Sequence, residues 1–153
     1  MQSSIALGPT KGFDLETIDV TVIAGAAFSK GDVVAMTPVA TGIWTTARVP
    51  VAQDLISGIC GVCLTDIASG DEGIVRLQGF CQAYVFSSGG ATAIALGLPY
   101  VLATTKDLDV DAISAAPKKY SALVQETAAA SATRALKNVL FSGITGFGTA
   151  WLS

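Results

Sequence analysis

Three cysteines are the residues of this chain best suited to chemistry. Cys60-Gly61-Val62-Cys63 has the spacing of redox and zinc motifs, and Cys81 is the third thiol. Structural zinc takes four ligands, whereas this chain offers three thiols and no histidine. The apolar stretch Ile56–Thr65 predicts a strand, in which three residues span about 10 Å, beyond the ~7 Å limit of a disulfide. A tight turn at Gly61 would allow a disulfide; otherwise we expect buried, reduced, structural cysteines.

Two other motifs with chemical potential are incomplete. Asp107, Asp109 and Asp111 alternate as in a calcium loop, but leucine and valine separate them and the EF-hand glycine and final glutamate are missing. We therefore interpret Lys106–Lys119 as a solvated surface loop. Gly143–Gly148 is glycine-rich like a phosphate-binding loop, but no helix is expected after it. The sequence predicts no metal site and no cofactor.

Catalytic constellations are also missing from the sequence. Without histidine, the chain lacks the commonest general base and every Ser-His or Cys-His pair. Asp54, Asp71 and Glu72 lie in predicted turns, and no spacing forces two carboxylates together. We expect a protein that binds rather than catalyses. A small β-barrel enzyme or ligand-binding module that uses Asp71 or Lys30 remains an alternative.

The composition points to self-association. Hydrophobic residues make up 51% of the 153 residues and charged residues only 14%, against roughly 25% in typical domains. A lone monomer with so few charges would cover its apolar surface poorly. Nine basic against twelve acidic residues give a net charge of −3, which does not favour nucleic acid as a partner.

The sequence also indicates no membrane segment and no signal peptide. Leu77–Thr105 carries no charge, but glutamines, a Ser-Gly cluster and Pro99 interrupt it, so it lacks a continuous apolar span. Met1–Thr10 has no basic region of the kind that opens a signal peptide. We expect synthesis in the cytoplasm.

Alternating and short apolar stretches predict a chain built mainly of strands. Gly79 is expected to bend one strand that continues from Gly73 to Phe86. Ala91–Leu98 and Thr127–Asn138 are ambiguous between a short helix and irregular strands. The expected strands are Ile18–Val22, Val33–Met36, a hairpin over Val39–Arg48, Ile56–Thr65, Gly73–Phe86, Tyr100–Thr104 and Tyr120–Glu126. The predicted fold is mainly β: a single compact β-sandwich or barrel-like domain over 15–153, with at most one or two short helices and an extended N-terminal arm over 1–14.

Several of these elements together resemble the capsid cement, or head decoration, proteins of tailed bacteriophages. The resemblance covers Glu16 to Phe86 and rests on a succession of Gly-Asp turns and Gly-Val strands. Its motifs are Lys30-Gly31-Asp32-Val33-Val34, Ile59-Cys60-Gly61-Val62, Ala68-Ser69-Gly70-Asp71 and Val75-Arg76-Leu77-Gln78-Gly79, with Ala35-Met36-Thr37-Pro38 and Gly79-Phe80 as weaker matches. The resemblance implies a homotrimer that binds the major capsid protein on the outer surface of the virion and is not an enzyme.

Large apolar side chains are the candidates for contacts with the capsid or with other subunits. A tail, fibre or surface-layer subunit would have the same composition and remains an alternative to a cement protein. The candidate interface residues are Ile5, Leu7, Phe13, Trp44, Phe80, Tyr84, Phe86 and Trp151.

Overall fold

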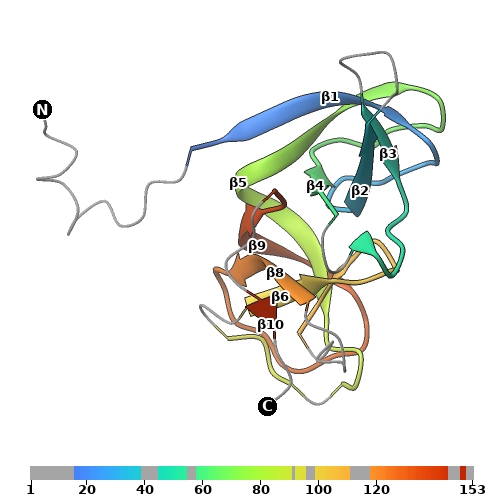
Figure 1. The fold of residues 1–153 in the computed structure, drawn as a ribbon. Helices are drawn as coiled ribbons and strands as arrows, with labels where there is room; N and C mark the ends of the chain where they lie inside the picture. The colour runs from blue at the N-terminus through green and yellow to red at the C-terminus, as the bar shows by residue number, and fades with distance from the viewer. Residues whose placement is uncertain are drawn as a thin grey trace, which may run out of the picture.

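The chain folds into strands joined by short turns in the computed structural model (Figure 1). The structure describes residues 16–38, 45–54, 58–90, 92–95, 99–110, 118–144 and 149–150. Among these residues, Asp54 is the only one in a helical state, so the described part of the chain is built of strands, turns and loops. It contains no helix with the length and apolarity needed to cross a bilayer. The strands are β1 (Ile18–Ala24), β2 (Val33–Pro38), β3 (Thr45–Arg48), β4 (Cys60–Cys63), β5 (Glu72–Phe86), β6 (Pro99–Leu102), β7 (Leu108–Asp109), β8 (Lys118–Val124), β9 (Ala135–Ser142) and β10 (Thr149–Ala150).

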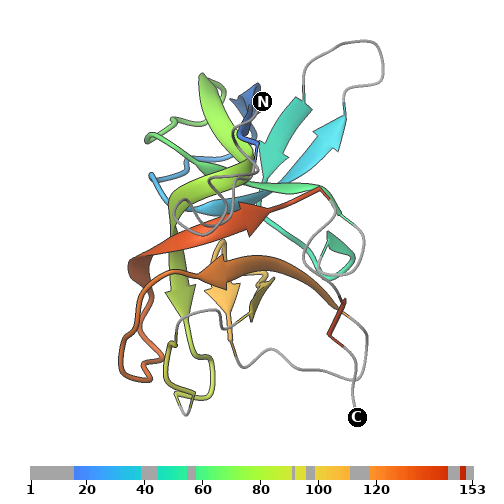
Figure 2. The same ribbon diagram turned by 90° about the vertical axis from the view of Figure 1, so that its left-hand side faces the viewer.

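Two closed rings of strands share the long strand β5. The first barrel is closed by the pairings β1–β3–β2–β4–β5–β1, and the second by β5–β7–β6–β8–β9–β5. Gly79 lies at the bend between the halves of β5, with a φ of +123° that favours glycine. Both views show β5 passing from one barrel into the other (Figures 1 and 2). The predictions of a mainly β, barrel-like fold and of the bend at Gly79 are confirmed.

Strands β2 and β4 form a wall between two hydrophobic cores. Val34 and Cys63 point into the core of the first barrel, whereas Val33, Cys60 and Val62 pack into that of the second. Because both faces are covered, these strands are continuous apolar runs rather than alternating ones. β1 has one face in the core and one in solvent, and its residues alternate as predicted.

The first barrel contains a pair of loops related by a local two-fold axis. Phe28 and Ile67 exchange backbone hydrogen bonds of 2.8 and 2.9 Å. Gly31 N–H donates to Cys63 O and Gly70 N–H donates to Ala24 O, at equivalent positions of the two loops. Both glycines have φ near +90°, which explains the Gly-Asp turns of the sequence.

Two local predictions need correction. Lys106–Lys119 is not a solvated loop where it is described: Asp107 and Asp109 are buried, and Leu108–Asp109 is the strand β7. β4 is shorter than the predicted Ile56–Thr65 strand. For Thr127–Asn138, which the sequence left open between a helix and irregular strands, the structure shows the second: it contains no helix, and β9 begins within it, at Ala135.

Candidate functional site

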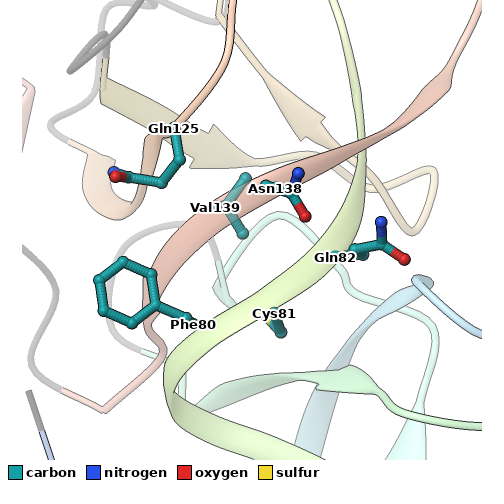
Figure 3. A pocket seen from close by; sticks show the side chains of 6 residues that line it. All are labelled: Phe80, Cys81, Gln82, Gln125, Asn138 and Val139. Atoms are coloured by element: carbon teal, nitrogen blue, oxygen red, sulfur yellow. The ribbon is translucent and has the colours of Figure 1, made fainter.

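The most exposed aromatic side chain among the described residues lies on the outer face of the second barrel. Phe80 leaves 48% of its surface in solvent, immediately after the bend in β5. Figure 3 shows it beside a shallow pocket of about 360 Å³. The pocket lies over β5, β9 and the end of β8 and has no charged side chain in its lining. It is lined by Phe80, Cys81, Gln82, Gln125, Asn138 and Val139.

The register of β5 and β9 places the amides of this pocket next to one another. Gln82 is the cross-strand partner of Asn138, and the Gln125 N–H donates to Asn138 O at 2.9 Å. The Asn138 side chain is oriented by its Nδ2, which donates to Glu126 Oε2 at 2.9 Å. Each amide has both donor and acceptor atoms. The pocket therefore offers an aromatic ring and neutral hydrogen-bonding groups, which suits a peptide segment better than an ion or a reacting substrate.

The same stretch of β5 has one side on which the described strands leave a gap. β1 pairs with β5 as far as Ile18–Gln78, and β7 pairs only with Val85 and Phe86. Between them, the Tyr84 N–H donates to Gly31 O on this side. Because alternate residues of a strand point their backbone groups to the same side, the backbone groups of Phe80 and Gln82 also point into the gap. The Phe80 carbonyl accepts from Arg76 Nη1 at 2.6 Å.

A second cluster consists of charged side chains between the barrels. Asp32, 1% exposed, accepts from Arg134 Nη2 at 2.5 Å and lies 3.3 Å from Lys106 Nζ. Arg134 also stacks on Tyr84, its guanidinium carbon 3.6 Å from the ring centroid. Lys106 lies 5.6 Å from the centroid of Phe28. We call Asp32, Lys106, Asp107 and Arg134 the inter-barrel cluster.

Asp107 is the least well compensated member of this cluster. Its Oδ1 lies 2.8 Å from Arg134 Nε, but the two atoms are not aligned for a hydrogen bond. Burial raises the pKa of Asp107, although Thr105 and the nearby Arg134 favour its charged form. The buried carboxylates of Asp32 and Asp107 pair with the partly exposed cations of Lys106 and Arg134, so the arrangement joins the barrels.

The cysteines are reduced and structural. Cys60 and Cys63 are buried on β4, and the Cys60 thiol lies 3.7 Å from Ser121 Oγ. Burial raises the pKa of Cys63 and of Cys81 to about 12, so neither is a thiolate at neutral pH. No cluster of three potential metal ligands occurs among the described residues.

The structure brings three of the eight predicted interface residues onto one face. Phe80, Tyr84 and Phe86 alternate along β5 and point away from the second core, but Tyr84 is half-buried under Arg134. The alternative enzyme residues do not form a site: Asp71 and Lys30 are exposed in separate turns. The predicted arm 1–14 and five predicted interface residues lie outside the described residues: Ile5, Leu7, Phe13, Trp44 and Trp151.

Sequence reasoning missed the amides and the charges that the fold brings together. Gln82, Gln125 and Asn138 are ordinary polar residues in sequence, and only the β5–β9–β8 register makes them neighbours. The sequence did contain one indication that Asp32 could be buried, because this residue directly precedes the apolar stretch Val33–Met36. Its partner Arg134 is 102 residues away and has no such signal.

Comparison with known proteins gives a shared fold. No protein-family model matches this chain, and no curated protein matches its sequence. Among solved structures, it is similar to the N base of head fiber gp8.5 of bacteriophage phi29, with a TM-score of 0.53 and 12% identity. The similarity covers 85% of this chain and 98% of the other. At this identity the two proteins share a fold, and nothing more follows directly.

Proposed function

We propose that this chain is a structural subunit of a tailed-phage virion, a cement protein that binds the outer surface of the head as a homotrimer. The observation that carries the proposal is the shared fold with a phage head-fiber base over nearly all of that chain. The Gly-Asp turns from which the resemblance to cement proteins was drawn are the two turns of the first barrel in which Gly31 and Gly70 have φ near +90°. In this proposal the major capsid protein is the partner and no reaction is catalysed.

The architecture suits a protein that must bear load. Closed barrels leave few free strand edges, and β5 links the two barrels by a continuous backbone of fifteen residues. The inter-barrel cluster adds side-chain links between the same two bodies. Tension applied to one barrel would pass to the other through covalent bonds and buried ion pairs rather than through a flexible linker.

The distribution of charge favours a protein partner over nucleic acid. The sequence has nine Lys and Arg residues, and at least five of them, all in the described part of the chain, form ion pairs with carboxylates of the same chain: Arg48, Arg76, Lys106, Arg134 and Lys137. Few cations remain to neutralise phosphates. Large apolar side chains on the surface, such as Val51 and Ile59, are the groups that protein interfaces bury.

Binding to heads of the phage that encodes the chain tests the proposal. Purified protein is mixed with expanded, DNA-free heads, and bound chains are counted after sedimentation through a cushion. We expect saturable binding in multiples of three per site and an increase in the temperature at which heads rupture. A protein that is monomeric and leaves the heads unbound would overturn the proposal.

A fibre base is the second candidate function, and the neighbour's own description as a head-fiber base favours it. A fibre subunit would occupy a few discrete positions, whereas a cement subunit covers the capsid lattice. Labelling this chain with gold-conjugated antibody on intact virions separates the two: sparse projecting label supports the fibre, and label on the tail excludes both.

A further inference from the structure

Three carboxamide side chains form a row across the outer face of the second barrel. Gln82 on β5 lies opposite Asn138 on β9, and Gln125, at the end of β8, donates its backbone N–H to Asn138 O from the other side. Direct partners in an antiparallel pair point to the same face of a sheet, and all three residues are exposed. Because neighbouring strands lie about 4.8 Å apart, the row places three hydrogen-bonding groups within about 10 Å.

An apolar row lies directly beside the carboxamides. Phe80 is opposite Leu140, and Leu140 is opposite Leu123, each two residues along its strand from the row of amides. Leu140 is buried and Leu123 is half-buried, whereas the Phe80 ring is exposed and borders the pocket (Figure 3). The pocket therefore combines one exposed aromatic ring with a line of neutral hydrogen-bonding groups.

Two of the carboxamides are oriented by contacts within the protein. Asn138 Nδ2 donates to Glu126 Oε2, and Gln125 Nε2 donates to Leu123 O at 3.3 Å. Each bond uses one N–H of a group that has two N–H donors and a carbonyl acceptor, so donors and acceptors remain for a ligand. Side chains that are already oriented lose less conformational entropy when a ligand binds.

This chemistry fits a neutral sugar. A hydroxyl both donates and accepts hydrogen bonds, as a carboxamide does, so a row of three amides matches the several hydroxyls along the edge of a sugar. The C–H groups on the face of a sugar ring carry partial positive charge and pack on the negative face of an aromatic ring such as Phe80. The lining contains no cation that would select an anionic ligand. The volume of about 360 Å³ lies in the range of small-molecule sites, roughly 300–1,000 Å³.

A peptide segment is less well matched to this row of side chains. An extended peptide binds a sheet by adding a strand to a free edge. At the amide row, β5, β9 and β8 are instead paired with one another. A ligand that lies over the row contacts side-chain amides rather than a strand edge, which favours a polyhydroxylated ligand.

We propose that Phe80, Gln82, Gln125 and Asn138 form a binding site for a neutral oligosaccharide, with the ring on a sugar face and the amides on its hydroxyls. The inference concerns the isolated chain and does not rest on the function proposed above. If heads remain unbound while sugar binding is found, the cement function fails and this inference stands. If heads are bound but sugars are not, the reverse holds.

NMR titration of the full-length, ¹⁵N-labelled chain tests the site. The probes are neutral trisaccharides of glucose, galactose, mannose and N-acetylglucosamine, together with a sulfated trisaccharide and an uncharged peptide. We expect at least one neutral trisaccharide to bind with a Kd of about 1 mM or lower and to shift the side-chain amide signals of Gln82, Gln125 and Asn138. Binding of the peptide alone, binding of no neutral sugar, or binding that leaves these signals unmoved would overturn the proposal.

Matched variants test which side chains bind the sugar. Phe80→Ala removes the ring, and Gln82→Glu replaces a carboxamide with a carboxylate of the same shape. Ile74→Ala is the control, because it removes a 46% exposed apolar side chain from the other half of β5. We expect Phe80→Ala and Gln82→Glu each to weaken binding of the neutral sugar about tenfold, and Ile74→Ala to leave it unchanged. Equal effects of Phe80→Ala and Ile74→Ala, with both variants folded by circular dichroism, would contradict the assignment.

Discussion

The two barrels differ in how far each supplies its own core. Among the described residues, every side chain in the core of the first barrel comes from that barrel's own strands and turns. The core of the second barrel also includes Val33, Cys60 and Val62, which come from strands of the first.

This asymmetry indicates that the second barrel depends on the first for its stability. The main polar contact between the barrels also depends on a residue of the first barrel, because Asp32 is the carboxylate that forms ion pairs with Lys106 and Arg134. Changes at the shared wall or at Asp32 should therefore damage the second barrel more than equivalent changes confined to the first.

The largest effect is expected from Asp32→Asn. This change removes the buried carboxylate that Arg134 and Lys106 share. Breaking a buried pair typically costs about 3–5 kcal/mol, but both cations are about one-third exposed and Arg134 keeps Asp107, so we expect about 3 kcal/mol. Asp19→Asn is the control, because Asp19 pairs with Arg76 in a half-exposed position and should cost less than about 1 kcal/mol. Urea unfolding followed by circular dichroism gives both values. Equal costs would show that the inter-barrel cluster contributes no more than a surface ion pair.

The two-fold related glycines provide a second test. A Cβ at Gly31 would lie 2.3 Å from Leu136 Cδ1 of the second barrel, whereas a Cβ at Gly70 would meet nothing within 4 Å. Both positions have positive φ, so Gly70→Ala should cost about 1 kcal/mol from backbone strain alone. Gly31→Ala also requires the partly exposed Leu136 side chain to move and should cost about 2 kcal/mol in total. Thermal unfolding measures the pair, and similar costs would mean that Leu136 moves aside without loss.

Neighbouring valines on β2 separate the two cores. Val33 and Val34 are both fully buried, one in each core, so the same substitution by alanine removes equal volume from different barrels. Each should cost about 2 kcal/mol. Amide hydrogen exchange should show Val33→Ala raising exchange in β6, β8 and β9, and Val34→Ala raising it in both barrels. Exchange that stays within the first barrel for Val34→Ala would contradict the dependence of the second on the first.

Sequence patterns predicted the first barrel better than the second, because the first barrel builds its core from its own strands and turns. Its strands either alternate, as in β1, or are continuous apolar runs, as in β4, and its turns carry Gly-Asp. In the second barrel, Asp107 suggested a solvated loop because local sequence cannot show that Arg134 lies beside it. The candidate site divides similarly: Phe80 and the bend at Gly79 were predictable, whereas the amides of the pocket become neighbours only through strand register.

The smallest expected effect concerns the pH dependence of stability. The buried carboxylates of Asp54 and Asp107 should contribute to it with opposite signs. Burial favours the neutral form of Asp54, but hydrogen bonds from Arg48 and from the Val51 N–H outweigh it and lower its pKa. Asp54 therefore contributes stability that is present above its unfolded pKa of 3.8 and is lost as the pH falls through the lower folded value. Burial instead raises the pKa of Asp107, so its contribution is present below 3.8 and is lost as the pH rises through the higher folded value.

Substitution by asparagine should reveal these opposite signs. As the pH rises from 3 to 6, Asp54→Asn should become less stable relative to the parent chain, because the parent gains a stabilising carboxylate. Over the same range Asp107→Asn should become more stable relative to the parent, since it avoids burying a charge that Arg134 compensates incompletely. Urea midpoints at five pH values, with the parent chain measured alongside each variant, give the slopes. Slopes of the same sign would mean that Asp107 is as well paired in the second barrel as Asp54 is in the first.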